Sequence, residues 1–198
     1  MAKSERVEFP GALGETLAAR LETPAGQPRA YALFAHCFSC SKDTHAANRI
    51  SRRLAQAGFA VLRFDFTGLG QSDGDFANTN FSSNIQDLVK AGEFLAAQYQ
   101  APALMVGHSL GGAAVIAAAA QLPSVRAIAT LAAPADASHV RRTLKPGIAE
   151  IEAKGEAEVM LGGRPFPLRK PFPPDLHGHA LLDPLPHVTP APRAPHHP

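Results

Sequence analysis

Short runs of apolar residues recur along the first two thirds of the chain, at residues 30–37, 60–66, 103–109 and 125–134. Runs of this length that are apolar at most positions are typical of strands buried on both faces of a parallel sheet. The first thirty residues instead predict one or two antiparallel strands at the edge of that sheet.

A helical pattern fills the segment between the first two runs, over residues 44–58. Its apolar residues are spaced three or four positions apart and share one helical face: Ala47, Ile50, Leu54 and Ala57. Asp43 is a candidate N-cap, and Gly58 is a candidate stop. We therefore expect an amphipathic crossover helix between the first two buried strands.

Two further helices are expected downstream. Residues 80–99 repeat the amphipathic pattern through Tyr99, whereas residues 110–122 are apolar on nearly every side and should form the most deeply buried helix, ended by Pro123. Strands that alternate with helices in this way predict an α/β fold with right-handed crossovers and a doubly wound, mostly parallel sheet. Such sheets bind ligands beyond the carboxyl ends of their strands.

The regular alternation ends at residue 134. Residues 135–170 predict a helix followed by a hairpin that turns at Gly162 and Gly163, in a cap-like insertion over the sheet. Residues 171–198 are rich in proline, which opposes strands and long helices, and we expect a disordered tail there. Residues 1–134 are then the core of the fold.

The charge is nearly balanced, with 19 Lys and Arg against 17 Asp and Glu, and no block of like charges indicates binding to nucleic acid or to an anionic membrane. The N-terminal residues contain no apolar stretch of signal-peptide length, and no apolar run reaches the roughly 20 residues that span a bilayer. Two cysteines, Cys37 and Cys40, are too few for a disulfide scaffold. We expect a cytoplasmic protein in a reducing compartment.

The candidate chemistry centres on the segment VGHSLGG, residues 106–112. Ser109 lies between Gly107 and Gly111, after a predicted strand and before a predicted helix. This context favours a strained turn that exposes the serine hydroxyl, next to a helix N-terminus whose dipole favours a developing oxyanion. The alternative is a serine that only caps the helix.

Three segments in this order resemble the α/β-hydrolase family. LFAHCFSCSKD resembles the family's loop after its third strand, with Cys37 in place of a glycine. LRFDFTGLGQSDGDF resembles the loop after the fourth strand, with Thr67 in place of an arginine, and VGHSLGG resembles the nucleophile elbow. The likeness covers about residues 5–135 and is greatest to bacterial hydrolases that are often fused to an OsmC-type domain. It implies an α/β-hydrolase sheet that is incomplete on its C-terminal side.

The resemblance also implies site residues. It makes Ser109 the nucleophile and the backbone N–H groups of Leu110 and Phe38 the oxyanion hole. His36 then braces its loop, since the family's base follows the nucleophile along the chain, and Asp65 and Ser72 fix the loop after the fourth strand. The implied reaction is acyl transfer to water from a small-molecule substrate, either a small ester or an amide or peptide, with no cofactor and no metal.

The acid and the base that would activate Ser109 stay open, because the family places them on strands for which the proline-rich region offers no pattern. A substitute triad could use an acid and one of three histidines: Asp136 with His139, His177 or His179. Without them the chain is a catalytically impaired hydrolase or a binding module. An incomplete sheet would also leave an open edge through which the chain could self-associate.

A different class of function, thiol redox chemistry, rests on the C-x-x-C pattern formed by Cys37 and Cys40. The pair follows a predicted strand and precedes a predicted helix, a position that lowers the pKa of a thiol and makes it reactive. The two cysteines could also be passive core residues. The order of the neighbouring motifs favours the hydrolase over the redox protein.

Overall fold

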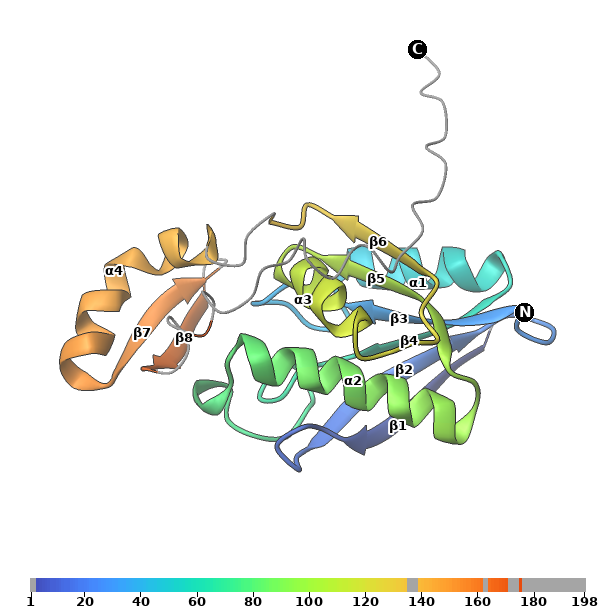
Figure 1. Cartoon of the computed structure of the whole chain (residues 1–198), viewed down its shortest axis with the longest axis horizontal. Helices are drawn as coiled ribbons and strands as arrows, with labels where there is room; N and C mark the ends of the chain where they lie inside the picture. The colour runs from blue at the N-terminus through green and yellow to red at the C-terminus, as the bar shows by residue number, and fades with distance from the viewer. Residues whose placement is uncertain (1–2, 135–138, 162–163, 171–174, 176–198) are drawn as a thin grey trace, which may run out of the picture.

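The computed structural model describes residues 3–134, 139–161, 164–170 and 175. A six-stranded sheet carries helices on both faces, and a smaller two-stranded unit lies beside the carboxyl ends of its parallel strands (Figure 1). The expected α/β architecture is confirmed.

The sheet has the strand order β1-β2-β4-β3-β5-β6. Its strands are β1 (Lys3–Pro10), β2 (Thr16–Thr23), β3 (Ala30–Ala35), β4 (Phe59–Phe64), β5 (Pro102–His108) and β6 (Ala127–Leu131). β2 pairs antiparallel with both β1 and β4, as expected for the N-terminal strands, and the other pairs are parallel. β6 is the last strand of this sheet in the described part of the chain, and the Leu131 side chain is 40% exposed.

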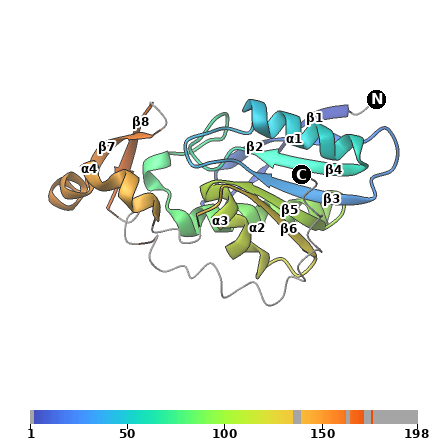
Figure 2. The same ribbon diagram turned by 90° about the horizontal axis from the view of Figure 1, so that it is seen from above.

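Helices cover both faces of the sheet because its parallel strands are apolar on both sides. α1 (His45–Gln56) covers one face, and α2 (Phe81–Gln98) and α3 (Leu110–Ala119) cover the other (Figure 2). α3 is buried along most of its length, as its apolar composition predicts, and it ends ahead of Pro123. Tyr99 does not share the buried face of α2: it is the C-cap and is 41% exposed.

The N-cap of α1 corrects one prediction. Thr44, not Asp43, caps the helix, and its hydroxyl accepts a hydrogen bond from the Ala47 N–H at 3.4 Å. The Asp43 carboxylate instead pairs with Arg63 at 2.9 Å. An ion pair with a buried guanidinium outweighs a cap that the neighbouring threonine can also supply. Gly58 follows the helix at φ 92°, in the position expected of a stop residue.

The expected helix and hairpin are present after the core: α4 (His139–Lys154), β7 (Glu156–Leu161) and β8 (Arg164–Arg169), with β7 and β8 antiparallel. The unit packs on η1 (Phe76–Asn78), where the ring centroids of Phe76 and Phe166 lie 5.2 Å apart. The exact limits of the core, insertion and tail stay predictions. Of residues 171–198 only Asp175 is described, and its carboxylate accepts hydrogen bonds from the Ser82 N–H at 2.7 Å and hydroxyl at 2.6 Å.

Within the described ranges, no helix combines the length and the apolar character that crossing a bilayer requires.

Candidate active site

Ser109 occupies the tight turn between β5 and α3. Its backbone angles are φ 55° and ψ −127°, a region that costs a non-glycine residue roughly 1–3 kcal/mol. The Ser109 N–H donates to the Leu131 carbonyl oxygen at 2.8 Å, which anchors the turn to β6. The hydroxyl does not cap α3, so the alternative of a serine that only caps the helix is wrong.

The two flanking glycines are required by close backbone contacts. A Cβ atom on Gly107 would overlap the backbone of Gly111, and one on Gly111 would overlap the carbonyl oxygen of His36. The N-terminus of α3 therefore lies directly against the end of β3. This contact brings Leu110 next to the loop that carries Phe38.

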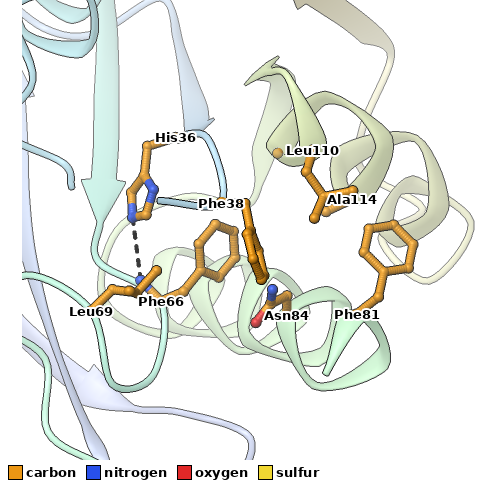
Figure 3. Close-up of a pocket in the computed structure, with 9 residues that line it drawn as sticks. His36, Phe38, Phe66, Leu69, Phe81, Asn84, Leu110 and Ala114 are labelled. Atoms are coloured by element: carbon orange, nitrogen blue, oxygen red, sulfur yellow. Dashed lines mark hydrogen bonds between the residues drawn. The ribbon is translucent and has the colours of Figure 1, made fainter. Parts of the chain in front are cut away.

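The loop after β3 begins with a turn over residues 37–40, in which the Cys40 N–H donates to the Cys37 carbonyl oxygen at 3.0 Å. Phe38 lies within this turn, and its side chain is buried. Phe38 and Leu110 line the same pocket (Figure 3). The structure thus brings together the two residues to which the resemblance assigns the oxyanion donors.

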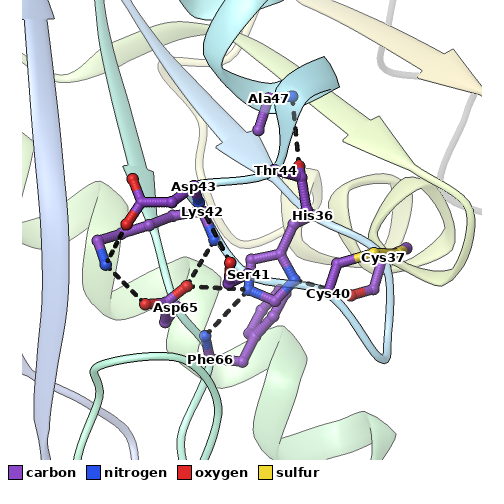
Figure 4. The surroundings of a disulfide bond; sticks show 10 residues. All are labelled: His36, Cys37, Cys40, Ser41, Lys42, Asp43, Thr44, Ala47, Asp65 and Phe66. Carbon is purple, nitrogen blue, oxygen red and sulfur yellow. Dashed lines mark hydrogen bonds and ion pairs between the residues drawn. A yellow bond between two sulfur atoms is a disulfide. The ribbon is translucent and has the colours of Figure 1, made fainter. Parts of the chain in front are cut away.

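His36 ties two loops together with both of its ring nitrogens (Figure 4). Nδ1 lies 2.7 Å from the Cys37 carbonyl oxygen, and Nε2 accepts from the Phe66 N–H at 3.4 Å. A carbonyl requires a donor and an N–H requires an acceptor, so these partners fix a neutral ring protonated at Nδ1. Burial lowers the pKa of His36, which keeps the ring neutral. His36 is a brace, in the role that the resemblance implies.

Asp65 organises the loop after β4 from a fully buried position. Its carboxylate accepts from the Lys42 ammonium at 2.7 Å (Figure 4). It also accepts from the Gln71 N–H at 2.9 Å. The Ser72 hydroxyl donates to the Asp65 carbonyl oxygen at 2.6 Å. The expected structural roles of Asp65 and Ser72 agree with these contacts. Lys42, which the sequence did not single out, is the buried counter-ion of Asp65.

A second buried ion pair joins Arg63 of β4 to Glu22 of β2 at 2.9 Å. The signal that could have found it is a single arginine inside the apolar run AVLRFDF, at a position that a neighbouring strand covers. Paired charges of this kind hold the sheet in register, and neither faces the pocket.

Thr67 stands where the family loop has an arginine, and it forms hydrogen bonds to the buried carboxylate of Asp87. Its N–H and hydroxyl donate to one oxygen of the Asp87 carboxylate, at 3.1 and 2.9 Å. Burial raises the pKa of Asp87, while these hydrogen bonds and one from the Ala12 N–H oppose the rise. Thr67 thus ties the loop after β4 to α2.

The pocket is small, with a cavity volume of about 10 Å³, and is lined mainly by apolar groups. Its lining residues are His36, Phe38, Phe66, Leu69, Phe81, Asn84, Leu110, Gly111 and Ala114 (Figure 3). Asn84 was not singled out from the sequence. The available signal was its spacing, because Asn84 lies three residues after Phe81 and four before Leu88, on the face that α2 buries.

Cys37 and Cys40 form a disulfide in this structure (Figure 4). A C-x-x-C turn by itself brings two sulfur atoms into bonding range. The expected reducing compartment stays a prediction. The bond spans Phe38, so it constrains the loop that carries a proposed oxyanion donor.

The substitute triad lies outside what the structure describes, so it stays a prediction. Asp136, His177 and His179 lie outside the described residues, and His139 begins α4 at a position whose side chain is not described. The buried His36 does not offer a free ring nitrogen as a base, because one nitrogen contacts the Cys37 carbonyl oxygen and the other accepts from the Phe66 N–H. The described ranges also contain no group of three His, Cys, Asp or Glu side chains that could hold a metal ion.

A family model described as "Serine aminopeptidase, S33" matches residues 26–161. The chain belongs to this family of α/β-hydrolases. The resemblance of the three sequence segments is therefore confirmed at the level of the family.

Relatives of this chain are lipases and esterases. It is 28% identical over 113 residues to monoglyceride lipase of Rattus norvegicus, a match covering 56% of this chain and 37% of the lipase. It is 28% identical over 145 residues to monoacylglycerol lipase of Mycolicibacterium smegmatis, covering 70% of this chain and 50% of the lipase. The crystal structure of the esterase domain of a Rhodothermus marinus protein shares 52% identity at a TM-score of 0.72, covering 92% of this chain and 71% of that one. The chain thus spans half or less of the length of these two lipases.

Proposed function

We propose that this chain acts as a serine hydrolase that transfers the acyl group of a small ester to water, with Ser109 as the nucleophile. The observation that carries the proposal is the strained backbone of Ser109 at the strand-to-helix turn, with a hydroxyl that its own helix does not use. Strain at a position that the surrounding contacts hold firmly is typical of functional residues. The names of the relatives, lipases and esterases, support the same reaction class.

In the proposed reaction the Ser109 oxygen attacks the ester carbonyl carbon, and a base takes the hydroxyl proton. The carbonyl oxygen becomes negative and accepts hydrogen bonds from the Leu110 and Phe38 N–H groups. Collapse of this intermediate breaks the bond to the alcohol, which leaves with the proton. Water then attacks the acyl-serine by the same sequence and releases the carboxylic acid.

The pocket lining suits the acyl part of an uncharged substrate. Phe38 and Leu110 border it, so a carbonyl oxygen held by their N–H groups would direct its acyl chain toward Phe66, Phe81 and Ala114. Apolar walls favour a hydrocarbon chain by about 0.8 kcal/mol for each buried methylene. An amide or a peptide is the second substrate class, which the description of the matching family favours.

A panel of p-nitrophenyl esters of increasing acyl length tests the proposal. We expect hydrolysis that depends on chain length and that disappears in Ser109→Ala. The base is then found by replacing His139, His177 and His179 with Gln one at a time. A loss of about a hundredfold or more in kcat/KM identifies the base, because a general base contributes roughly 10²–10⁴-fold.

If no histidine matters and hydrolysis is absent, the chain is an impaired hydrolase or a binding module. The oxyanion hole and substrate binding alone still give about 10³–10⁴-fold over water. A very slow, Ser109-dependent rate with long incubation therefore distinguishes an impaired enzyme from a protein that only binds.

The disulfide between Cys37 and Cys40 favours thiol redox chemistry as a second candidate function. In that case one thiolate of a partner dithiol would attack a sulfur of the bond and form a mixed disulfide. The partner's second thiolate would then displace the remaining cysteine, which leaves Cys37 and Cys40 as thiols and the partner with a disulfide. Replacing both cysteines with Ser separates the two classes. Loss of dithiol oxidation with unchanged labelling of Ser109 by a fluorophosphonate would favour the redox function.

A further inference from the structure

The pocket is lined by one polar side chain, Asn84, whose amide oxygen has no hydrogen-bond partner among the described residues. Asn84 is 5% exposed. The figure places its amide beneath the Phe38 ring, on the side of the pocket formed by α2 (Figure 3). A buried amide oxygen that no protein group satisfies takes its hydrogen bond from water or from a bound molecule, because leaving it unpaired costs free energy.

The fold itself gives Asn84 no task. The N-terminus of α2 is capped by Asn80, whose side-chain oxygen accepts from the Ser83 N–H at 2.8 Å, and the Ser83 hydroxyl completes the capping box. The neighbours of Asn84 on the same helical face, Phe81 and Leu88, are buried and apolar. An apolar residue at position 84 would suit this packing, whereas the amide oxygen offers a hydrogen-bonding group to a molecule that enters the pocket.

His36, the other polar side chain of the pocket, is not available to hydrogen-bond a molecule that enters it. Both ring nitrogens of His36 are engaged, and burial lowers its pKa, so the ring brings no positive charge. With no charged group in its lining, the pocket would desolvate a carboxylate or an ammonium without compensation. The occupant is therefore neutral, mainly hydrocarbon, and carries one hydrogen-bonding group.

We propose that Asn84 selects substrates whose acyl chain carries a hydroxyl group, so that the preferred substrates are hydroxyacyl esters. This inference rests on the proposed function of Ser109 and names the acyl class of that site. A hydroxyl both donates and accepts, so it pairs with either end of the amide whichever way the amide is turned. The apolar lining around Asn84 holds the carbons of the chain.

The experiment compares p-nitrophenyl hexanoate with its 2-, 3- and 6-hydroxy derivatives, and leaves out the 4- and 5-hydroxy esters because these cyclise to lactones without an enzyme. We expect one position to raise kcat/KM about tenfold over the plain ester in the wild type, as one well-placed hydrogen bond to a buried group supplies. Asn84→Leu, which has a similar volume, should remove that preference and favour the plain ester. Asn84→Ser should keep part of the preference.

Gln86→Leu is the matched control, because Gln86 lies two residues further on α2 and its amide is exposed, bonded to Gln121. It should leave the ratio between the two esters unchanged. Thermal unfolding of Asn84→Leu should occur at the wild-type temperature or above it, since the variant removes an unpaired buried oxygen.

Binding without catalysis distinguishes this inference from the proposed function. Titration with hexanamide and the matching hydroxyhexanamide, followed by NMR, measures affinity whether or not Ser109 reacts. If the wild type binds the hydroxyamide roughly tenfold more tightly than the plain amide, and Asn84→Leu does not, the inference is supported even if no ester is hydrolysed. The inference is overturned if both esters and both amides give equal ratios in the wild type and in Asn84→Leu, even where Ser109-dependent hydrolysis is seen.

Discussion

The backbone of Gly111 lies so close to the carbonyl oxygen of His36 that a Cβ atom at Gly111 would overlap it. This contact holds the N-terminus of α3 against the end of β3 and so fixes Leu110 relative to Phe38. The proposed oxyanion hole thus depends on a position where no side chain fits.

Gly111→Ala should therefore destabilise the fold by about 3 kcal/mol, because the overlap is with backbone and cannot be relieved by turning a side chain. Urea unfolding measures the change. Gly26→Ala is the control, since nothing lies within 4 Å of a Cβ atom there. Equal stability of the two variants would show that α3 tolerates movement away from β3.

The strain at Ser109 predicts a variant that is more stable than the wild type. Ser109→Gly should raise the free energy of unfolding by about 1 kcal/mol, because glycine adopts positive φ without strain, although it gains more freedom in the unfolded chain. Ser109→Ala keeps the Cβ atom and should match the wild type. A Ser109→Gly protein less stable than Ser109→Ala would argue against a strained turn.

Much of this arrangement could be predicted from the sequence because it follows from local patterns. The spacing of apolar residues predicts the strands and helices, and the Gly-x-Ser-x-Gly turn predicts the conformation of Ser109. The cap of α1 was misassigned because Asp43 and Thr44 are both good caps, and the ion pair with Arg63 that decides between them joins residues distant in sequence.

Other features depend on long-range contacts that no local pattern reports. Arg63 and Lys42 are fully buried because Glu22 and Asp65 reach them from other segments. Asn84 looks like an ordinary polar residue of a helix until the packing of α2 against Phe38 is known. The C-x-x-C pattern did single out Cys37 and Cys40, the two residues that form the disulfide.

The buried ring of His36 predicts how stability depends on pH. Burial lowers the pKa of His36 below its ordinary value of 6.5. The positive charge of Lys42 lowers it further, and the negative charge of Asp65 opposes the shift. Below pH 6.5 the unfolded chain takes up a proton that the folded ring refuses, so stability is full above this pH and falls as the pH drops toward the folded pKa.

One histidine changes the free energy of unfolding by at most about 1.4 kcal/mol for each pH unit. This dependence should be absent in His36→Asn, which can be compared with the wild type by urea unfolding between pH 5 and 7. Identical slopes in the two proteins would mean that His36 titrates normally in the folded state.

The outer edge of β6 predicts self-association. Within the described residues no strand covers this edge, and the Leu131 side chain is 40% exposed. An uncovered strand edge pairs readily with another chain, and a charge at the edge opposes such pairing. Leu131→Lys should shift the protein toward the monomer in sedimentation velocity at a concentration where the wild type associates. An unchanged distribution would place any association elsewhere.

The most direct measurement of the central claim is covalent labelling of the intact protein by a fluorophosphonate, with the modified residue located by mass spectrometry. The account predicts a single adduct on Ser109, formed faster than on free serine, absent in Ser109→Ala and blocked by prior unfolding. Labelling requires attack by the serine oxygen and stabilisation of the same developing charge as ester hydrolysis, but not the release of product. A folded protein that forms no adduct at Ser109, or forms it equally on other serines, would contradict the assignment of Ser109 as an activated nucleophile.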